Sequence, residues 1–152
     1  MIREQIKAQL IEAMKAKNET KTGTLRLMNA AIKDKDIAAR PSGNADGIDD
    51  AAILSLFQSM IKQRRESIEL YQKGNRPELA DAEQAEIDII QSFLPKQMSA
   101  DEATLAIKAA IAATGASSVK DMGKVMAELK AKYAGQMDFG AASAAIKGLL
   151  GG

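Results

Sequence analysis

Helical periodicity constrains the fold of this chain more than any other feature of its sequence. Apolar residues recur at steps of three and four, which is typical of amphipathic α-helices, and the alternation expected of strands is nearly absent. Ala, Leu, Met, Lys, Glu and Gln, which favour helices, dominate, whereas aromatic residues make up only 3%. We therefore predict an all-α fold with a core of Leu, Ile, Met and Ala.

Turn and cap residues divide the first part of the chain into four predicted helices. The first helix has Ile2, Ile6, Leu10, Ala13 and Met14 on one face. We expect a turn over residues 18–24, with Thr20 or Thr22 as the cap of the second helix. After a loop over residues 40–47, Asp46 or Asp49 is placed to cap the third helix, Gly74 to end it, and Pro77 to open the fourth.

Pro95 marks the predicted boundary between two modules. It disfavours the helical conformation at Leu94, and Ser99 to Glu102 then match a capping box for a new helix. Gly115 and Gly135 are placed to end two helices, and Asp138 to cap a last one. The prediction is a four-helix module over residues 1–95 and a three-helix module over residues 96–152.

Composition excludes several kinds of chemistry. The 152 residues include no Cys and no His, so thiol nucleophiles, thiolate metal sites and His-based triads are absent. We predict no catalytic residues, no metal site and no cofactor. The net charge of +1 argues against a polyanion-binding field over the whole surface, so we expect no DNA binding, and any RNA contact requires a local patch.

The location of the protein is also predicted from sequence. The chain has no long uncharged apolar run, and we therefore expect no membrane span. Its amphipathic amino end contains Glu4 and Glu12, which argues against an organelle transit peptide. We expect a cytoplasmic protein.

The start of the predicted sixth helix is a candidate phosphate site. Ser117 and Ser118 lie where free backbone N–H groups favour an anion, and Lys120 and Lys124 follow within about a turn. Gly123 would let another backbone approach closely. Two alternatives stay open: Asp121 competes as an anion, and Gly123 allows tight helix packing.

Lys62, Arg64 and Arg65 form a second basic cluster. They could contact phosphates, but Lys62–Glu66 and Arg65–Glu69 have the spacing of intrahelical ion pairs, and we favour a solvated helix face. The carboxylates of the fourth helix are interpreted in the same way, as a solvated acidic face. They are Glu78, Asp81, Glu83, Glu86 and Asp88.

Several segments together resemble one known family, YqeY, over nearly the whole chain. They are KQRRES, the A-E-I-D-I step at Ala85, FLPKQMS and DMGKVM. This chain departs little from the family pattern. Met98 stands where a Leu is common, and the loop over residues 40–47 and the carboxyl end are particular to this chain. The resemblance implies a four-helix module followed by a three-helix module.

The resemblance also implies kinship with the tail domain of GatB, the tRNA-binding subunit of the glutamine-dependent amidotransferase that acts on Glu-tRNA or Asp-tRNA. The family is therefore labelled a carbon–nitrogen ligase with glutamine as amido donor, but the catalytic domain of GatB has no counterpart in these residues. By resemblance, Lys120, Gly123 and Lys124 are the candidate RNA contacts. Ser118 belongs to the same candidate site by position, with Lys130, Lys132 and Lys147 as supporting charge.

Three hypotheses follow from these observations. The first is a binding module for tRNA or a tRNA–enzyme complex, since seven lysines against five acidic residues give the chain from Pro95 onward a net charge of +2. The second is a protein-interaction adaptor without RNA contact. The third is an amidotransferase component, which the absence of His and Cys argues against.

Overall fold

The computed structural model describes residues 1–151, and it is all-α. Seven α-helices and two short 3-10 helices, η1 (Arg40–Ser42) and η2 (Val119–Asp121), account for the regular structure of these residues, in which no strand occurs. The predicted fold class is confirmed. The chain divides after Leu94 into two compact units, each with its own hydrophobic core.

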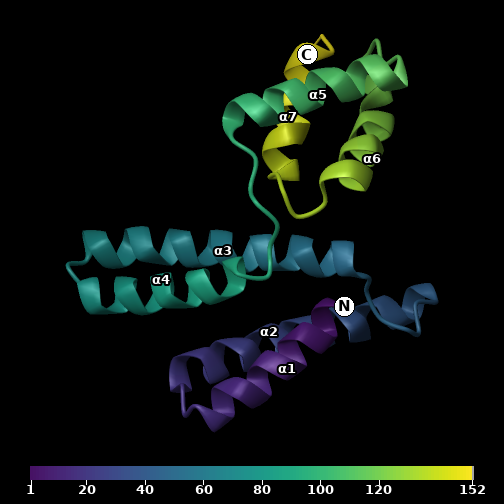
Figure 1. Ribbon diagram of the computed structural model, residues 1–152. Helices are drawn as coiled ribbons and strands as arrows, with labels where there is room; N and C mark the ends of the chain where they lie inside the picture. The colour runs from purple at the N-terminus through teal and green to yellow at the C-terminus, as the bar shows by residue number, and fades with distance from the viewer. Residues whose placement is uncertain (152) are drawn as a thin grey trace. The chain divides into compact units, whose positions relative to one another are not determined.

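The N-terminal unit consists of two helical hairpins. Helix α1 packs against α2, helix α3 packs against α4, and α2 also contacts α4 (Figure 1). Contacts between α2 and α3 are fewer. The bounds are α1 (Ile2–Lys15), α2 (Glu19–Ala39), α3 (Asp50–Lys73) and α4 (Pro77–Gln91).

The cap residues explain where these helices begin and end. Asp49 caps α3, Gly74 follows its last turn, and Pro77 opens α4, as predicted. The predicted turn over residues 18–24 is wrong, because α2 begins at Glu19. The Asn18 side chain accepts a hydrogen bond from the backbone N–H of Lys21 at 3.1 Å, which makes Asn18 the cap in place of Thr20 or Thr22.

The core of this unit is aliphatic around one aromatic pair. The rings of Phe57 and Phe93 meet edge to face, with centroids 6.1 Å apart and an angle of 66°. Ile6, which was predicted to face inward, is buried around them, as are Leu25 and Met28 of α2. Met14 was also expected on the buried face, but 51% of it is exposed in the last turn of α1.

The C-terminal unit is a three-helix arrangement of α5 (Ala100–Thr114), α6 (Met122–Tyr133) and α7 (Phe139–Leu149) (Figure 1). Ser99 and Glu102 form the predicted capping box of α5. Asp138 accepts hydrogen bonds from the backbone N–H groups of Gly140 and Ala141 and caps α7.

The segment that leads into α5 is tied to the α6–α7 loop of the same unit. The Gln97 side chain donates to the carbonyl oxygen of Gly135 at 2.6 Å, and the Met98 N–H donates to the carbonyl oxygen of Gln136 at 2.9 Å. Val125, Leu129 and Ile146 are fully buried at the centre of the helices. Residues from Gln97 onward therefore pack with the C-terminal core.

Candidate functional site

The start of α6 is a turn closed by a carboxylate of the protein itself. Asp121 Oδ2 accepts hydrogen bonds from the backbone N–H groups of Ser117 at 3.0 Å and Ser118 at 3.3 Å. These two bonds, with a smaller contribution from Lys124, hold the pKa of the Asp121 carboxyl below its usual value. A phosphate at these amides would have to displace Asp121, so the lysine side chains are the available anion contacts.

Lys120 and Lys124 flank this turn and both are exposed. Among residues 1–151, neither forms an ion pair. Gly123 lies between them, and nothing within 4 Å would meet a Cβ placed there. Its missing side chain therefore does not serve packing between helices of this unit, and the surface beside the two lysines is open.

The remaining lysines of α6 do not extend this pair into one continuous stripe. Lys132 Nζ lies 2.9 Å from Glu128 Oε1, and this contact raises the pKa of Lys132. Because Lys124, Glu128 and Lys132 are four residues apart, the acidic side chain lies between the two lysines on one helix face. Lys130 is exposed about 120° around the helix from Lys124, at 100° per residue.

Lys147 lies in the last turn of α7 and is exposed. In the described part of the chain it has no ion-pair partner, as is also true of Lys130. Four candidate lysines of the C-terminal unit are therefore exposed and form no ion pair within residues 1–151: Lys120, Lys124, Lys130 and Lys147. The same is true of Lys96 and Lys108, which lie outside the candidate site.

The second basic cluster is divided between two roles. Arg64 Nε lies 2.9 Å from Glu86 Oε2 and 3.9 Å from Glu83 Oε2, and its side chain is only 15% exposed. It links α3 to α4. Lys62 and Arg65 are exposed, and within residues 1–151 neither forms the ion pair suggested by its spacing to Glu66 or Glu69.

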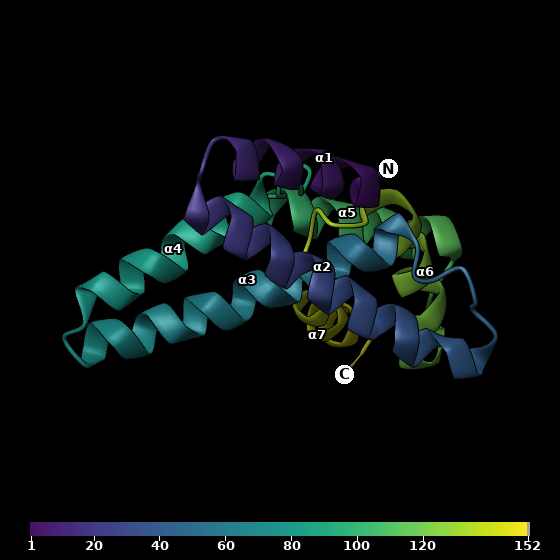
Figure 2. The same cartoon turned by 90° about the horizontal axis from the view of Figure 1, so that it is seen from below.

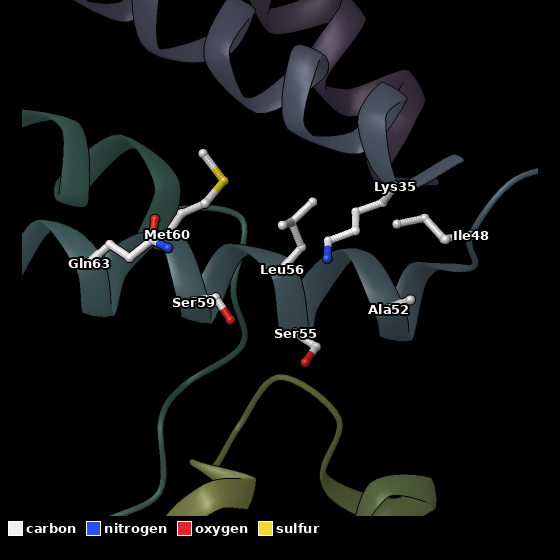
Figure 3. Close-up of a pocket in the computed structure, with 8 residues that line it drawn as sticks. All are labelled: Lys35, Ile48, Ala52, Ser55, Leu56, Ser59, Met60 and Gln63. Atoms are coloured by element: carbon white, nitrogen blue, oxygen red, sulfur yellow. The ribbon is translucent and has the colours of Figure 1, made fainter. Parts of the chain in front are cut away.

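A groove between α2 and α3, not anticipated from sequence, has a volume of about 530 Å³. Leu56 and Met60 point from α3 toward α2, Lys35 reaches from α2 toward α3, and Ser55 and Ser59 point the other way (Figure 3). Lys35 is the one charged residue of its lining. The lining of this groove offers no acid–base pair.

A similar groove lies in the C-terminal unit. Its lining comes from the segment before α5, from α5 itself and from the end of α6, and it includes Met98, Leu105 and Tyr133.

No group of three or more His, Cys, Asp or Glu residues is placed to hold a metal ion anywhere in residues 1–151. None of the described helices is long and apolar enough to cross a membrane.

Comparison with known proteins identifies relatives of this chain. The family described as "Yqey-like protein" matches residues 3–150. "Altered inheritance of mitochondria protein 41, mitochondrial" from Lachancea thermotolerans is 35% identical over 103 residues, which cover 68% of this chain and 53% of that protein. Its namesake from Eremothecium gossypii is 35% identical over 104 residues, or 68% of this chain and 55% of that protein.

The chain thus spans about half the length of the curated relatives it matches. Their names place those fungal proteins in mitochondria, whereas the cytoplasmic location expected for this chain stays a prediction. The family match covers nearly all of the sequence and both helical units. This chain therefore belongs to the YqeY family of Yqey-like proteins.

Proposed function

We propose that this protein is a non-catalytic binding module for tRNA or for a tRNA–enzyme complex. The observation that carries the proposal is that Lys120 and Lys124, beside the turn at the start of α6, are both exposed and make no ion pair within the described residues, as is also true of Lys130 and Lys147. Such lysines remain available to phosphate groups, which supply most of the affinity of proteins for nucleic acids.

Phosphate contacts by lysine side chains fit the geometry at α6 better than capture by backbone amides. Asp121 already occupies the N–H groups of Ser117 and Ser118, so the proposed contact is made by Lys120 and Lys124. The open space beside Gly123 would let the ribose–phosphate backbone approach the helix surface. The proposal assigns no bond-making chemistry to the chain, which has no His and no Cys.

The test is a titration of total tRNA with the full chain at several salt concentrations. Binding is expected to weaken steeply with salt, and Lys120→Ala with Lys124→Ala should reduce the salt slope by about two, roughly one per lost phosphate contact. Lys108→Ala, an exposed lysine of α5 outside this segment, is the matched control and should change neither affinity nor slope. Absence of any salt-sensitive binding at low ionic strength would refute the proposal.

A further inference from the structure

The side of α2 that faces away from the core carries a row of exposed residues that are small or apolar except for the acidic Asp34. Gly23, Leu27, Ala30, Asp34 and Ile37 follow one another at steps of four and three residues, and all five are exposed. Leu27 and Ile37 are 48% and 47% exposed. A Cβ at Gly23 would meet nothing within 4 Å. We call this row the α2 seam.

A row of cations runs along one edge of the α2 seam. Arg26, Lys33 and Arg40 are seven residues apart, and Arg26 and Lys33 directly precede the seam residues Leu27 and Asp34. All three are exposed, and over residues 1–151 none of them forms an ion pair. At 1.5 Å per residue the row is about 20 Å long.

The opposite edge of the seam carries no charge. Thr24, Ala31 and Ala38 occupy it, and Thr24 is buried. The surface is therefore one-sided, with a cationic edge, a neutral edge, and a centre that is small and apolar apart from Asp34. Figure 2 shows α2 beside α1, with which it forms the N-terminal hairpin.

The spacing of the seam matches the way in which one helix packs on another. Steps of four and three residues keep one narrow row of side chains facing a partner helix over two heptads. The small residues Gly23 and Ala30 would let a partner backbone approach, while Leu27 and Ile37 would supply the apolar contact. A glycine inside a helix destabilises it by roughly 0.5–1 kcal/mol relative to Ala, so Gly23 fits this arrangement better than it fits an isolated helix.

We propose that the α2 seam docks an amphipathic helix of another protein, apolar on the side that meets Leu27 and Ile37 and acidic along the edge that meets Arg26, Lys33 and Arg40. This partner is identified by charge complementarity, because the cationic row has no carboxylate partner in the described chain. The surface lies in the N-terminal unit and goes beyond the RNA-binding role proposed for the C-terminal unit.

Two other occupants fit the surface less well. In a two-fold antiparallel pairing of α2 with α2 of a second copy, symmetry would place the cationic row against itself, and a parallel pairing would leave it against the neutral edge. RNA would contact the cations but would gain nothing from the exposed Leu27 and Ile37, since positioning contacts go to phosphates.

The experiment uses the full chain and a fluorescent synthetic helical peptide three heptads long, with Leu on its apolar row and Glu on both edges. Fluorescence anisotropy should show salt-sensitive binding of this peptide. A second peptide with Lys in place of every Glu should bind at least tenfold more weakly. Leu27→Gln with Ile37→Gln, and separately Arg26→Glu with Lys33→Glu, should each weaken binding about tenfold or more.

Matched controls separate the α2 seam from general surface effects. Leu70→Gln changes the 68% exposed leucine of α3, and Lys108→Glu reverses an exposed charge of α5. Both should bind the acidic peptide like the wild-type chain, as should Lys120→Ala with Lys124→Ala. Circular dichroism should show unchanged helix content in every variant.

Several outcomes would overturn this inference. They are failure of the acidic peptide to bind, equal binding of the Lys peptide, and full binding by the variant that lacks Leu27 and Ile37. If total tRNA competes with the peptide, and this competition depends on Arg26 and Lys33 but not on Leu27 and Ile37, the cationic row would be an RNA contact instead. If sedimentation shows a dimer that only the seam variants lose, the α2 seam would bind a second copy of this chain instead.

Discussion

At the scale of single residues, one ion pair connects parts of the N-terminal unit that are distant in sequence. The Arg3 guanidinium donates to both carboxylate oxygens of Asp36, at 2.7 and 2.8 Å, and to the carbonyl oxygen of Ile48 at 2.8 Å. Asp36 also accepts from the Ile48 N–H at 2.8 Å. The start of α1, the last part of α2 and the residues before α3 thus meet at one carboxylate.

The stability of the protein should depend on pH through this carboxylate. Arg3, followed by the Ile48 N–H, lowers the pKa of Asp36 to about 2 from an ordinary value of 3.8. A group whose folded-state pKa is depressed contributes stability above the unfolded value and loses it as pH falls through the folded value. The side chains of Asp36 and Arg3 are 23% and 37% exposed, so solvent screens their interaction. We therefore expect the ion pair to contribute about 1–2 kcal/mol to the free energy of unfolding.

Urea unfolding of the wild-type chain and of Asp36→Asn from pH 7 to pH 2 tests this prediction. Asn keeps an oxygen acceptor for Ile48 and removes the charge. The stability difference between the two proteins should be full above about pH 4 and shrink toward pH 2. A difference that stays constant over this range would show that Asp36 acts through its shape and not through its charge.

Two glycines in the same loop offer a matched pair for testing how tightly this ion pair is enclosed. Gly43 and Gly47 both have φ of +90°, but a Cβ on Gly43 would meet nothing within 4 Å, whereas one on Gly47 would lie 2.6 Å from Asp36 Oδ1. Gly43→Ala should lower the free energy of unfolding by about 1–2 kcal/mol because of its positive φ. Gly47→Ala should lower the free energy of unfolding further. Thermal unfolding of both variants measures the two losses of stability, and equal losses would contradict the steric argument.

At the scale of helices, the α3–α4 hairpin is held by apolar packing and by Arg64. Arg64→Ala would leave Glu83 and Glu86 half-buried without their cation and should destabilise the protein by about 1–3 kcal/mol. The neighbouring Arg65 is exposed and unpaired within residues 1–151, so Arg65→Ala should change stability by less than about 0.5 kcal/mol. Denaturant unfolding measures both, and similar losses in the two variants would argue against a linking role of Arg64.

In helix α6, a substitution at Gly123 should affect protein stability and tRNA binding in opposite directions. With open space at its Cβ position, Gly123→Ala should stabilise the protein by up to about 1 kcal/mol through helix propensity. If RNA approaches the helix there, the same change should weaken tRNA binding. Gly148→Ala in α7, which also has open space, is the control and should leave tRNA affinity unchanged. Equal tRNA affinity of both variants would exclude a close approach at Gly123.

At the scale of the whole molecule, the two cores predict separable stability. Leu129 is fully buried in the C-terminal core and Phe57 in the N-terminal core. Leu129→Ala should remove about 2–5 kcal/mol from the C-terminal unit, and Phe57→Ala about 3–5 kcal/mol from the N-terminal unit. Hydrogen exchange by mass spectrometry should show each loss of protection confined to one side of Pro95. Loss on both sides in either variant would mean that the units unfold together.

The sequence alone determined which segments are helical and where most of them begin and end, because caps and apolar periodicity act over a few residues. It predicted the Ser99 capping box, the Pro77 start and the aliphatic core. It did not predict the Arg3–Asp36 and Arg64–Glu86 contacts, which span 33 and 22 residues. It also left open which lysines of the candidate site are paired and which are free.

Only the tertiary structure decided those questions. Whether Arg64 is a surface charge or a link between helices depends on how α4 lies against α3, and local spacing does not encode that. The exposure of Leu27 and Ile37 on α2 likewise depends on which side of the helix the other helices cover. Local hydrogen bonds and steric preferences set the helices, whereas burial and long-range charge pairing arise only when the helices pack together.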